Sequence, residues 1–253
     1  MPFLPLDSLR NGALEIGIEL SDEQLGQYDE FAAFLVETNT RFNLTRITEP
    51  QAITANHYLD SLLCLRAAEF GKGSRVIDIG SGAGFPGIPL KIARPDLAVT
   101  LVDSTFKKVR FMEQTIERLG LSNIEPVHAR AEDLGAENAM REAFDIACCR
   151  ALAELRIAAE LCLPFVAVGG RMIALKGADS GREIEDAENM IGRLGGRVEK
   201  TARASIPGTD IVRGYVVVQK TKKTPSGYPR PYAQIARTSG RPAAERKSGS
   251  EAH

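Results

Sequence analysis

The sequence predicts an α/β fold, in which a mostly parallel, seven-stranded sheet is covered by helices on both faces, ends in an antiparallel hairpin and is preceded by N-terminal helices. Three observations support this prediction. From residue 74 onward, short β-rich runs alternate with helix-length segments. The last two β-rich runs are joined by "SIPGTDIVRG", which is too short for a crossover helix. Before residue 70, apolar residues recur at helical spacing.

The N-terminal extension, residues 1–70, is predicted to contain two helices. Ser21 and Gln24 form a capping box, in which two side chains satisfy backbone donors at a helix start. A one-sided apolar face follows, made by Leu25, Tyr28, Phe31, Ala32, Leu35 and Val36. The second helix is expected at residues 51–68, with Ile53, Leu59, Leu62, Leu63 and Leu65 on its core side.

The α/β domain is predicted to span residues 71–223. Its parallel strands are expected at 75–79, 98–102, 124–128, 144–148 and 171–175, and its helices at 85–93, 105–119 and 152–163. The hairpin at the sheet edge is expected at 197–204 and 215–219.

Composition indicates a folded, cytoplasmic protein. Of the 253 residues, 43% are hydrophobic and 26% charged, and the net charge is -1. No apolar run reaches the roughly 18 residues of a spanning helix, and the first ten residues do not resemble a signal peptide. We therefore expect no membrane association. The four cysteines contain no C-x-x-C pair, so we also expect no metal site.

Charge is unevenly distributed along the chain. The net charge is -7 over residues 1–70, zero over 71–218 and +6 over 219–253. Because residues 224–253 are rich in Pro, Gly, Ser, Lys and Arg, we expect a basic, disordered tail there. This tail is a candidate contact for nucleic-acid phosphates, and a solubilising appendage is the other interpretation.

A glycine turn follows the first predicted strand in "VIDIGSGAGFPGIPLKI". Gly80, Gly82 and Gly84 allow a ligand to approach the backbone, as in a dinucleotide site. Asp103 ends the next strand, where a carboxylate can accept both hydroxyls of a ribose. Asp78, just before the turn, would repel a pyrophosphate, so the cationic, phosphate-free S-adenosylmethionine suits the turn better. Alternatively, Asp78 only caps amides of the loop.

Several ordered motifs resemble one known family. They are "NHYLDSLL", "VIDIGSGAGFPGIPLKI", "LVDSTFKKVRFM", "NIEPVHARAEDL", "CRALA" and "ALKG". Between about residues 24 and 219 the chain resembles the bacterial small-subunit ribosomal RNA guanine-N7 methyltransferase G family, also called glucose-inhibited division protein B. The resemblance implies a class I, Rossmann-like methyltransferase that uses S-adenosylmethionine. It also implies 16S ribosomal RNA as partner, within an assembled or assembling 30S subunit, and transfer to guanine 527 of the 530 loop.

The resemblance also implies which residues bind the cofactor. They are Gly80, Phe85, Asp103, Ala131, Glu132 and Arg150. Each has a structural alternative: Phe85 as a core residue, Ala131 and Glu132 as an ordinary loop, and Arg150 as an ion-pair partner.

No catalytic residue is assigned, because N7 of guanine has a lone pair and no proton to lose. Methylation of an exocyclic amine is disfavoured, since no [DN]-P-P-[FYW] stretch follows the fourth strand. Cytosine C5 needs a thiolate, so a C5 methyltransferase using Cys148 or Cys149 is one alternative. The expected proline before such a cysteine is missing. An NAD-dependent oxidoreductase and a non-catalytic nucleotide-binding regulator are the alternatives from other classes.

Substrate-side candidates are few. By the family pattern, His57, together with Asp60 and Ser61, can help to present RNA, although a helical histidine is more often structural. Arg150 and Lys176 end strands near the cofactor edge, where Lys176 could contact phosphate or remain solvated. The cluster Lys107, Lys108 and Arg110 follows the second strand and is consistent with the solvated face of a helix.

Overall fold

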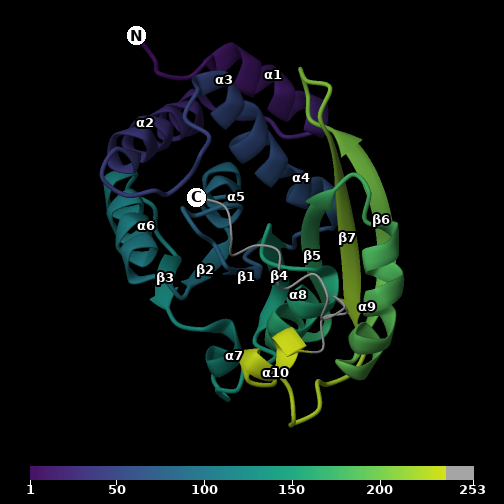
Figure 1. The fold of residues 1–253 in the computed structure, drawn as a ribbon. Helices are drawn as coiled ribbons and strands as arrows, with labels where there is room; N and C mark the ends of the chain where they lie inside the picture. The colour runs from purple at the N-terminus through teal and green to yellow at the C-terminus, as the bar shows by residue number, and fades with distance from the viewer. Residues whose placement is uncertain (238–253) are drawn as a thin grey trace, which may run out of the picture.

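The computed structural model describes residues 1–237, and its centre is one seven-stranded sheet (Figure 1). The sheet order is β3-β2-β1-β4-β5-β7-β6. Neighbours among β1 to β5 are parallel, whereas β7 is antiparallel to both β5 and β6, which confirms the predicted hairpin. The strands are β1 (Arg75–Ile79), β2 (Ala98–Asp103), β3 (Ile124–His128), β4 (Phe144–Arg150), β5 (Val166–Gly177), β6 (Gly196–Ser205) and β7 (Val212–Lys220).

Helices cover both faces of this sheet (Figure 1). The core on one face is shared by α1 (Leu6–Ile16), α2 (Asp22–Asn39), α4 (Asp60–Ala67), α5 (Gly87–Ala93) and α6 (Phe106–Arg118). The other packs against α7 (Ala131–Leu134), α8 (Leu155–Cys162), α9 (Gly181–Arg193) and α10 (Tyr232–Arg237), with the short 3₁₀ turn η2 (Leu163–Phe165) between α8 and β5. Successive strand residues alternate between the two cores: Val76 belongs to the first and Ile77 to the second. Burial on both faces explains the continuous apolar runs of the central strands.

The N-terminal extension packs into the first of these cores. The capping box is confirmed, because Gln24 N donates to Ser21 Oγ at 3.2 Å and Ser21 N donates to Gln24 Oε1 at 2.8 Å. The expected second helix is three consecutive pieces, α3 (Pro50–Ile53), a π-helix η1 (Thr54–Leu59) and α4. Helices α1, α7, α9 and α10 and this π-helix were not predicted from the sequence. A π-helix turns successive side chains by less than an α-helix does, so the change of pitch alters which residues face the sheet.

The expected disorder from residue 224 is wrong for residues 224–237. Arg141 donates to the backbone oxygens of Thr224 and Tyr228 at 2.8 and 2.7 Å. Arg230 pairs with the buried Glu160 at 2.6 Å, and Ile235 of α10 is buried. These partners lie far away in sequence, so the local composition did not reveal them. Residues 238–253, the rest of the expected tail, lie outside the described residues.

Candidate cofactor and substrate site

Two adjoining pockets open at the carboxyl ends of the parallel strands. The smaller, of about 380 Å³, lies over β1 and β2, and the larger, of about 540 Å³, extends toward β4, β5 and β7. Gly80, Lys108 and Ala151 line both, so the pockets form one continuous site. The strand order reverses between β1 and β4, which is where open α/β sheets bind their ligands.

The glycine turn forms the floor between the two pockets. Gly80 has φ +73°, and a Cβ there would lie 2.5 Å from Leu152 Cδ1, which lines the smaller pocket. Gly87 begins α5 so close to β1 and β2 that a Cβ would collide with the side chain of Leu101. A side chain at either position would displace its neighbours, so glycine allows Leu152 to pack against the turn at Gly80 and α5 to pack closely on the sheet at Gly87.

Asp78 lies beneath the turn and lines neither pocket. Its Oδ2 accepts a hydrogen bond from Gly87 N at 2.9 Å, as the amide-capping alternative expected. Its Oδ1 is buried without a partner among the described residues. Burial raises the pKa of Asp78 to about 7, and the amide of Gly87 opposes that rise. A cation bound above the turn would favour the charged form of this carboxyl.

The smaller pocket has the features of a nucleoside site without phosphate. Asp103 Oδ2 accepts from Gly82 N at 3.0 Å and Oδ1 accepts from Thr105 N at 2.8 Å, which leaves each oxygen one further acceptor position. Lys108 lies 3.6 Å from Asp103, and the other lining cation, Arg130, lies 3.7 Å from Glu132. Both of these cations therefore have carboxylate partners, and in the described part of the chain this pocket offers no unpaired cation to a pyrophosphate.

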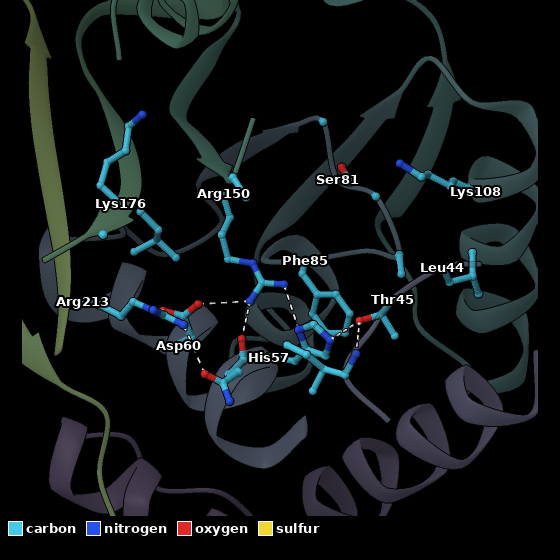
Figure 2. Close-up of a pocket in the computed structure, with 18 residues that line it drawn as sticks. Leu44, Thr45, His57, Asp60, Ser81, Phe85, Lys108, Arg150, Lys176 and Arg213 are labelled. Carbon is cyan, nitrogen blue, oxygen red and sulfur yellow. Dashed lines mark hydrogen bonds and ion pairs between the residues drawn. The ribbon is translucent and has the colours of Figure 1, made fainter. Parts of the chain in front are cut away.

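Arg150 is the central side chain of the larger pocket (Figure 2). From the end of β4 it donates to Asn56 O at 2.6 Å, to Asp60 Oδ2 at 3.1 Å and to His57 Nδ1 at 3.0 Å. Its guanidinium carbon lies 5.0 Å from the ring centre of Phe85. Arg150 therefore connects the sheet to η1 and α4, which agrees with the ion-pair interpretation from the sequence.

His57 is held as a neutral ring. Because a guanidinium can only donate, Nδ1 accepts from Arg150, and Nε2 carries the proton toward Thr45 Oγ1 at 3.0 Å. The ring stacks on Phe85, with centroids 4.3 Å apart. Burial, and then the charge of Arg150, lower the pKa of His57 to about 3. At physiological pH His57 is uncharged, and both ring nitrogens have partners.

Asp60 is buried between two guanidinium groups (Figure 2). In addition to Arg150, Arg213 from the start of β7 donates to Asp60 Oδ1 at 3.2 Å and to Asn56 Oδ1 at 3.2 Å. This cluster, Asn56, Asp60, Arg150 and Arg213, joins the N-terminal extension to two strands and forms one wall of the larger pocket.

The remaining candidates have structural partners. Lys176 Nζ donates to Ala153 O at 2.6 Å and pairs with Glu183 at 2.7 Å, so its amine is not free to contact phosphate in this conformation. Cys148 and Cys149 line neither pocket and are buried. Cys148 Sγ donates to Ile77 O at 3.6 Å, and burial raises the pKa of its thiol well above the usual value.

All six residues expected to bind the cofactor line the site. Asp103, Ala131 and Glu132 line the smaller pocket, Phe85 and Arg150 the larger, and Gly80 both. Sequence reasoning missed Thr45, Asn56, Arg213 and Tyr232. Arg213 had a signal, since a lone arginine in the apolar strand "VRGYVVV" needs a partner. No sequence signal indicated Tyr232, because it lies in the segment expected to be disordered.

Within residues 1–237, no helix has the length and hydropathy to cross a membrane. The same residues contain no cluster of His, Cys, Asp or Glu that could hold a metal ion.

Comparisons with known proteins agree with this geometry. Residues 24–210 match the model of the rRNA small subunit methyltransferase G family. A ribosomal RNA small subunit methyltransferase G from Clostridium perfringens is 38% identical over 231 residues, covering 91% of this chain and 97% of its own. One from Alkaliphilus metalliredigens is 42% identical over 222 residues, covering 88% and 93%.

Among solved structures, a glutamate-to-glutamine mutant of MtNAS in complex with S-adenosylmethionine matches 86% of this chain and 78% of its own. The TM-score is 0.53 and the identity 18%, a likeness of fold that confirms the Rossmann-like class. Together with the sequence matches over most of the chain, these findings show that the protein belongs to the rRNA small subunit methyltransferase G family.

Proposed function

We propose that this protein transfers a methyl group from S-adenosylmethionine to N7 of a specific guanine in 16S ribosomal RNA. Family membership supports the reaction class, the donor and the RNA substrate. One observation from the site supports the acceptor atom. The imidazole and carboxylate side chains that line the larger pocket, His57 and Asp60, are held by Arg150 and Arg213. The described residues therefore offer no free general base there, and N7 needs none.

The smaller pocket fits the adenosine part of S-adenosylmethionine. Asp103 retains acceptor capacity for the ribose hydroxyls, and Ala131 and Glu132 flank the position of the base. Gly80, which lines both pockets, and the nearby carboxyl of Asp78, whose Oδ1 has no partner among the described residues, suit the cationic methionine end. Phe85 and Arg150 then form the wall of the larger pocket beside that end.

When bound, the cofactor supplies a methyl group on a positively charged sulfur. The C–S bond breaks as the lone pair of N7 forms the new C–N bond, so the positive charge moves to the purine and no proton is released. The chain's residues contribute by holding donor and acceptor in line and by excluding water. Phe85 and the neutral His57 present stacked rings to the larger pocket, and a planar ring there is compatible with a purine.

We further propose that the substrate is presented by the assembled or assembling 30S subunit in the cytoplasm. The described chain consists of one sheet and its covering helices, without an appended RNA-binding module that could select a single guanine. Methyl transfer to 30S subunits should therefore exceed transfer to protein-free 16S RNA. Equal transfer to a protein-free fragment would contradict this.

The decisive experiment maps N7-methylguanine in 16S RNA by mass spectrometry with and without this protein. We expect one guanine to depend on the protein, and modification at cytosine C5 instead would contradict the proposed acceptor. Titration calorimetry with S-adenosylhomocysteine, NAD and ATP tests the ligand class separately. Only the first should bind, because the cations of the smaller pocket, Lys108 and Arg130, are already paired.

A further inference from the structure

The phenylalanine and tyrosine side chains that remain exposed in residues 1–237 gather around the site. They are Phe42, Phe106 and Tyr232, with 41%, 59% and 44% of their surface accessible. Tyr232 lines the smaller pocket. Phe42 lies in the loop whose next residues line the larger pocket, and Phe106 follows Thr105 of the smaller one. Tyr232 can be assigned to the cofactor pocket, which leaves Phe42 and Phe106 without a role.

The two exposed phenylalanines belong to segments that contact each other. Helices α2 and α6 pack side by side, with the rings of Phe34 and Phe111 5.3 Å apart. This packing brings the loop after α2 against the first turn of α6. There Lys107 Nζ lies 5.2 Å from the ring centre of Phe42. The loop and the helix start therefore form one continuous surface at the mouth of the larger pocket.

This surface also carries unpaired positive charge. Arg41, Arg46 and Lys107 are not buried, and none forms an ion pair with a carboxylate among the described residues. No acidic residue lies between the two arginines. Arg110 is not counted, because it lies 3.7 Å from Glu113. Arg41 and Arg46 are two of the four basic residues in residues 1–70, a segment whose net charge is -7.

We propose that Arg41, Phe42, Arg46, Phe106 and Lys107, the rim surface, bind single-stranded RNA on either side of the target guanine. Exposed rings stack on unpaired bases, and neighbouring cations contact phosphates. A base that must enter a pocket is necessarily unstacked from its neighbours, which frees their faces for the two rings. The proposal rests on the proposed RNA substrate and adds where that RNA lies.

The test measures methyl transfer with 30S subunits as the varied substrate. For Phe42→Ala combined with Phe106→Ala, we expect KM for the subunit to rise about tenfold or more, because base stacking is lost. Phe42→Tyr, which keeps the ring, should retain the wild-type KM. Affinity for S-adenosylhomocysteine, measured by calorimetry, should not change in any of these variants, which also shows that they are folded.

Charge is tested separately by salt dependence. For a single-stranded 16S fragment, the salt slope is the slope of the logarithm of the binding constant against the logarithm of the salt concentration. In Lys107→Ala this slope should become shallower by about 0.7, the value for one phosphate contact. Lys72→Ala is the control, because Lys72 is exposed before β1, at the opposite end of the sheet from the pockets. It should leave the slope unchanged.

Three results would each overturn the proposed RNA-binding role of the rim surface. The first is a wild-type KM in the double alanine variant, and the second is a salt slope in Lys107→Ala equal to that of wild type. The third is a cross-link from Phe42 to a ribosomal protein instead of RNA. If the wild-type protein transfers no methyl group to ribosomal RNA, the proposed function fails. The fragment-binding measurement then still decides whether the rim binds RNA.

Discussion

Replacing Asp60 by asparagine tests whether the buried carboxylate holds the larger pocket together. Its side chain is 5% exposed and receives hydrogen bonds from Arg150 at 3.1 Å and Arg213 at 3.2 Å. An amide would turn one acceptor oxygen into an NH₂ group that faces a guanidinium donor. Both arginines would then lose the compensating charge.

The loss of stability in Asp60→Asn can be estimated from the exposure of Arg150 and Arg213, the two partners of Asp60. Removing one member of a buried charge pair costs about 3–5 kcal/mol. Arg150 and Arg213 keep 16% and 29% of their side-chain surface accessible, so water relieves part of that penalty. We expect the free energy of unfolding to fall by about 2–3 kcal/mol, since the net effect must lie below the fully buried value. For a chain of this size, the midpoint temperature of thermal unfolding should fall by about 4–12 °C.

Thermal and urea unfolding, followed by circular dichroism, measure this loss. Asp22→Asn is the matched control, because Asp22 pairs with Arg10 on the surface, where its side chain is 91% exposed. Because Asp22 also lies in the first turn of α2, its loss should cost at most about 1 kcal/mol, less than the loss expected for Asp60→Asn. If Asp60→Asn unfolds at the wild-type temperature, the guanidinium groups do not depend on the carboxylate and the reasoning is wrong. Methyl transfer measured well below the midpoint should fall as well, because Arg150 would lose the carboxylate that helps to orient it.

Three further predictions concern single features of the site. Replacing both Cys148 and Cys149 by serine should leave methyl transfer measurable, because neither lines a pocket, and complete loss in a folded, cofactor-binding variant would restore the thiolate mechanism. The pKa of His57 is about 3 in the folded protein and 6.5 in the unfolded chain. Below pH 6.5 the unfolded state therefore binds more protons than the folded state, so protonation of His57 lowers the free energy of unfolding as the pH falls. Between pH 8 and 5, the free energy of unfolding of the wild type, measured by urea titration, should fall by about 2 kcal/mol more than that of His57→Asn. If the two proteins lose the same free energy of unfolding over this range, the ring is solvated. Tyr232→Ala should weaken S-adenosylhomocysteine binding about fivefold, since an aromatic ring that lines the smaller pocket is lost, whereas Tyr232→Phe should not; equal affinities would show that the ring of Tyr232 does not contact the ligand.

The sheet could be predicted because its signals are local. Each parallel strand is a short, apolar run that both cores bury, and the glycine turn follows the first of them directly. Gly80 and Asp103 mark two neighbouring strand ends, so their meeting at one edge follows from the parallel topology alone. Gly80 and Asp103 needed no knowledge of distant contacts. Ala131 and Glu132 after β3 were assigned only through the family resemblance, because their local sequence is also that of an ordinary loop.

The wall of the larger pocket could not be predicted in the same way. Asn56 and Arg213 are hydrogen-bonded although they lie 157 positions apart in sequence. No local feature of the sequence near either residue indicates that the other is its partner. The pitch of η1 also depends on packing against the sheet, since "TANHYL" has no feature that would exclude an ordinary α-helix. The C-terminal segment escaped prediction for the same reason, because its order depends on Arg141 and Glu160.

These long-range contacts change how the N-terminal extension should be understood. Residues 1–70 look like a separate acidic segment in sequence, but Asp60 accepts hydrogen bonds from β4 and β7 at once. His57 supplies one face of the larger pocket, and Thr45 holds that ring in place. The extension can therefore not move away without removing a wall of the site and leaving Arg150 without its partners. The larger pocket therefore forms completely only when the extension is docked on the sheet.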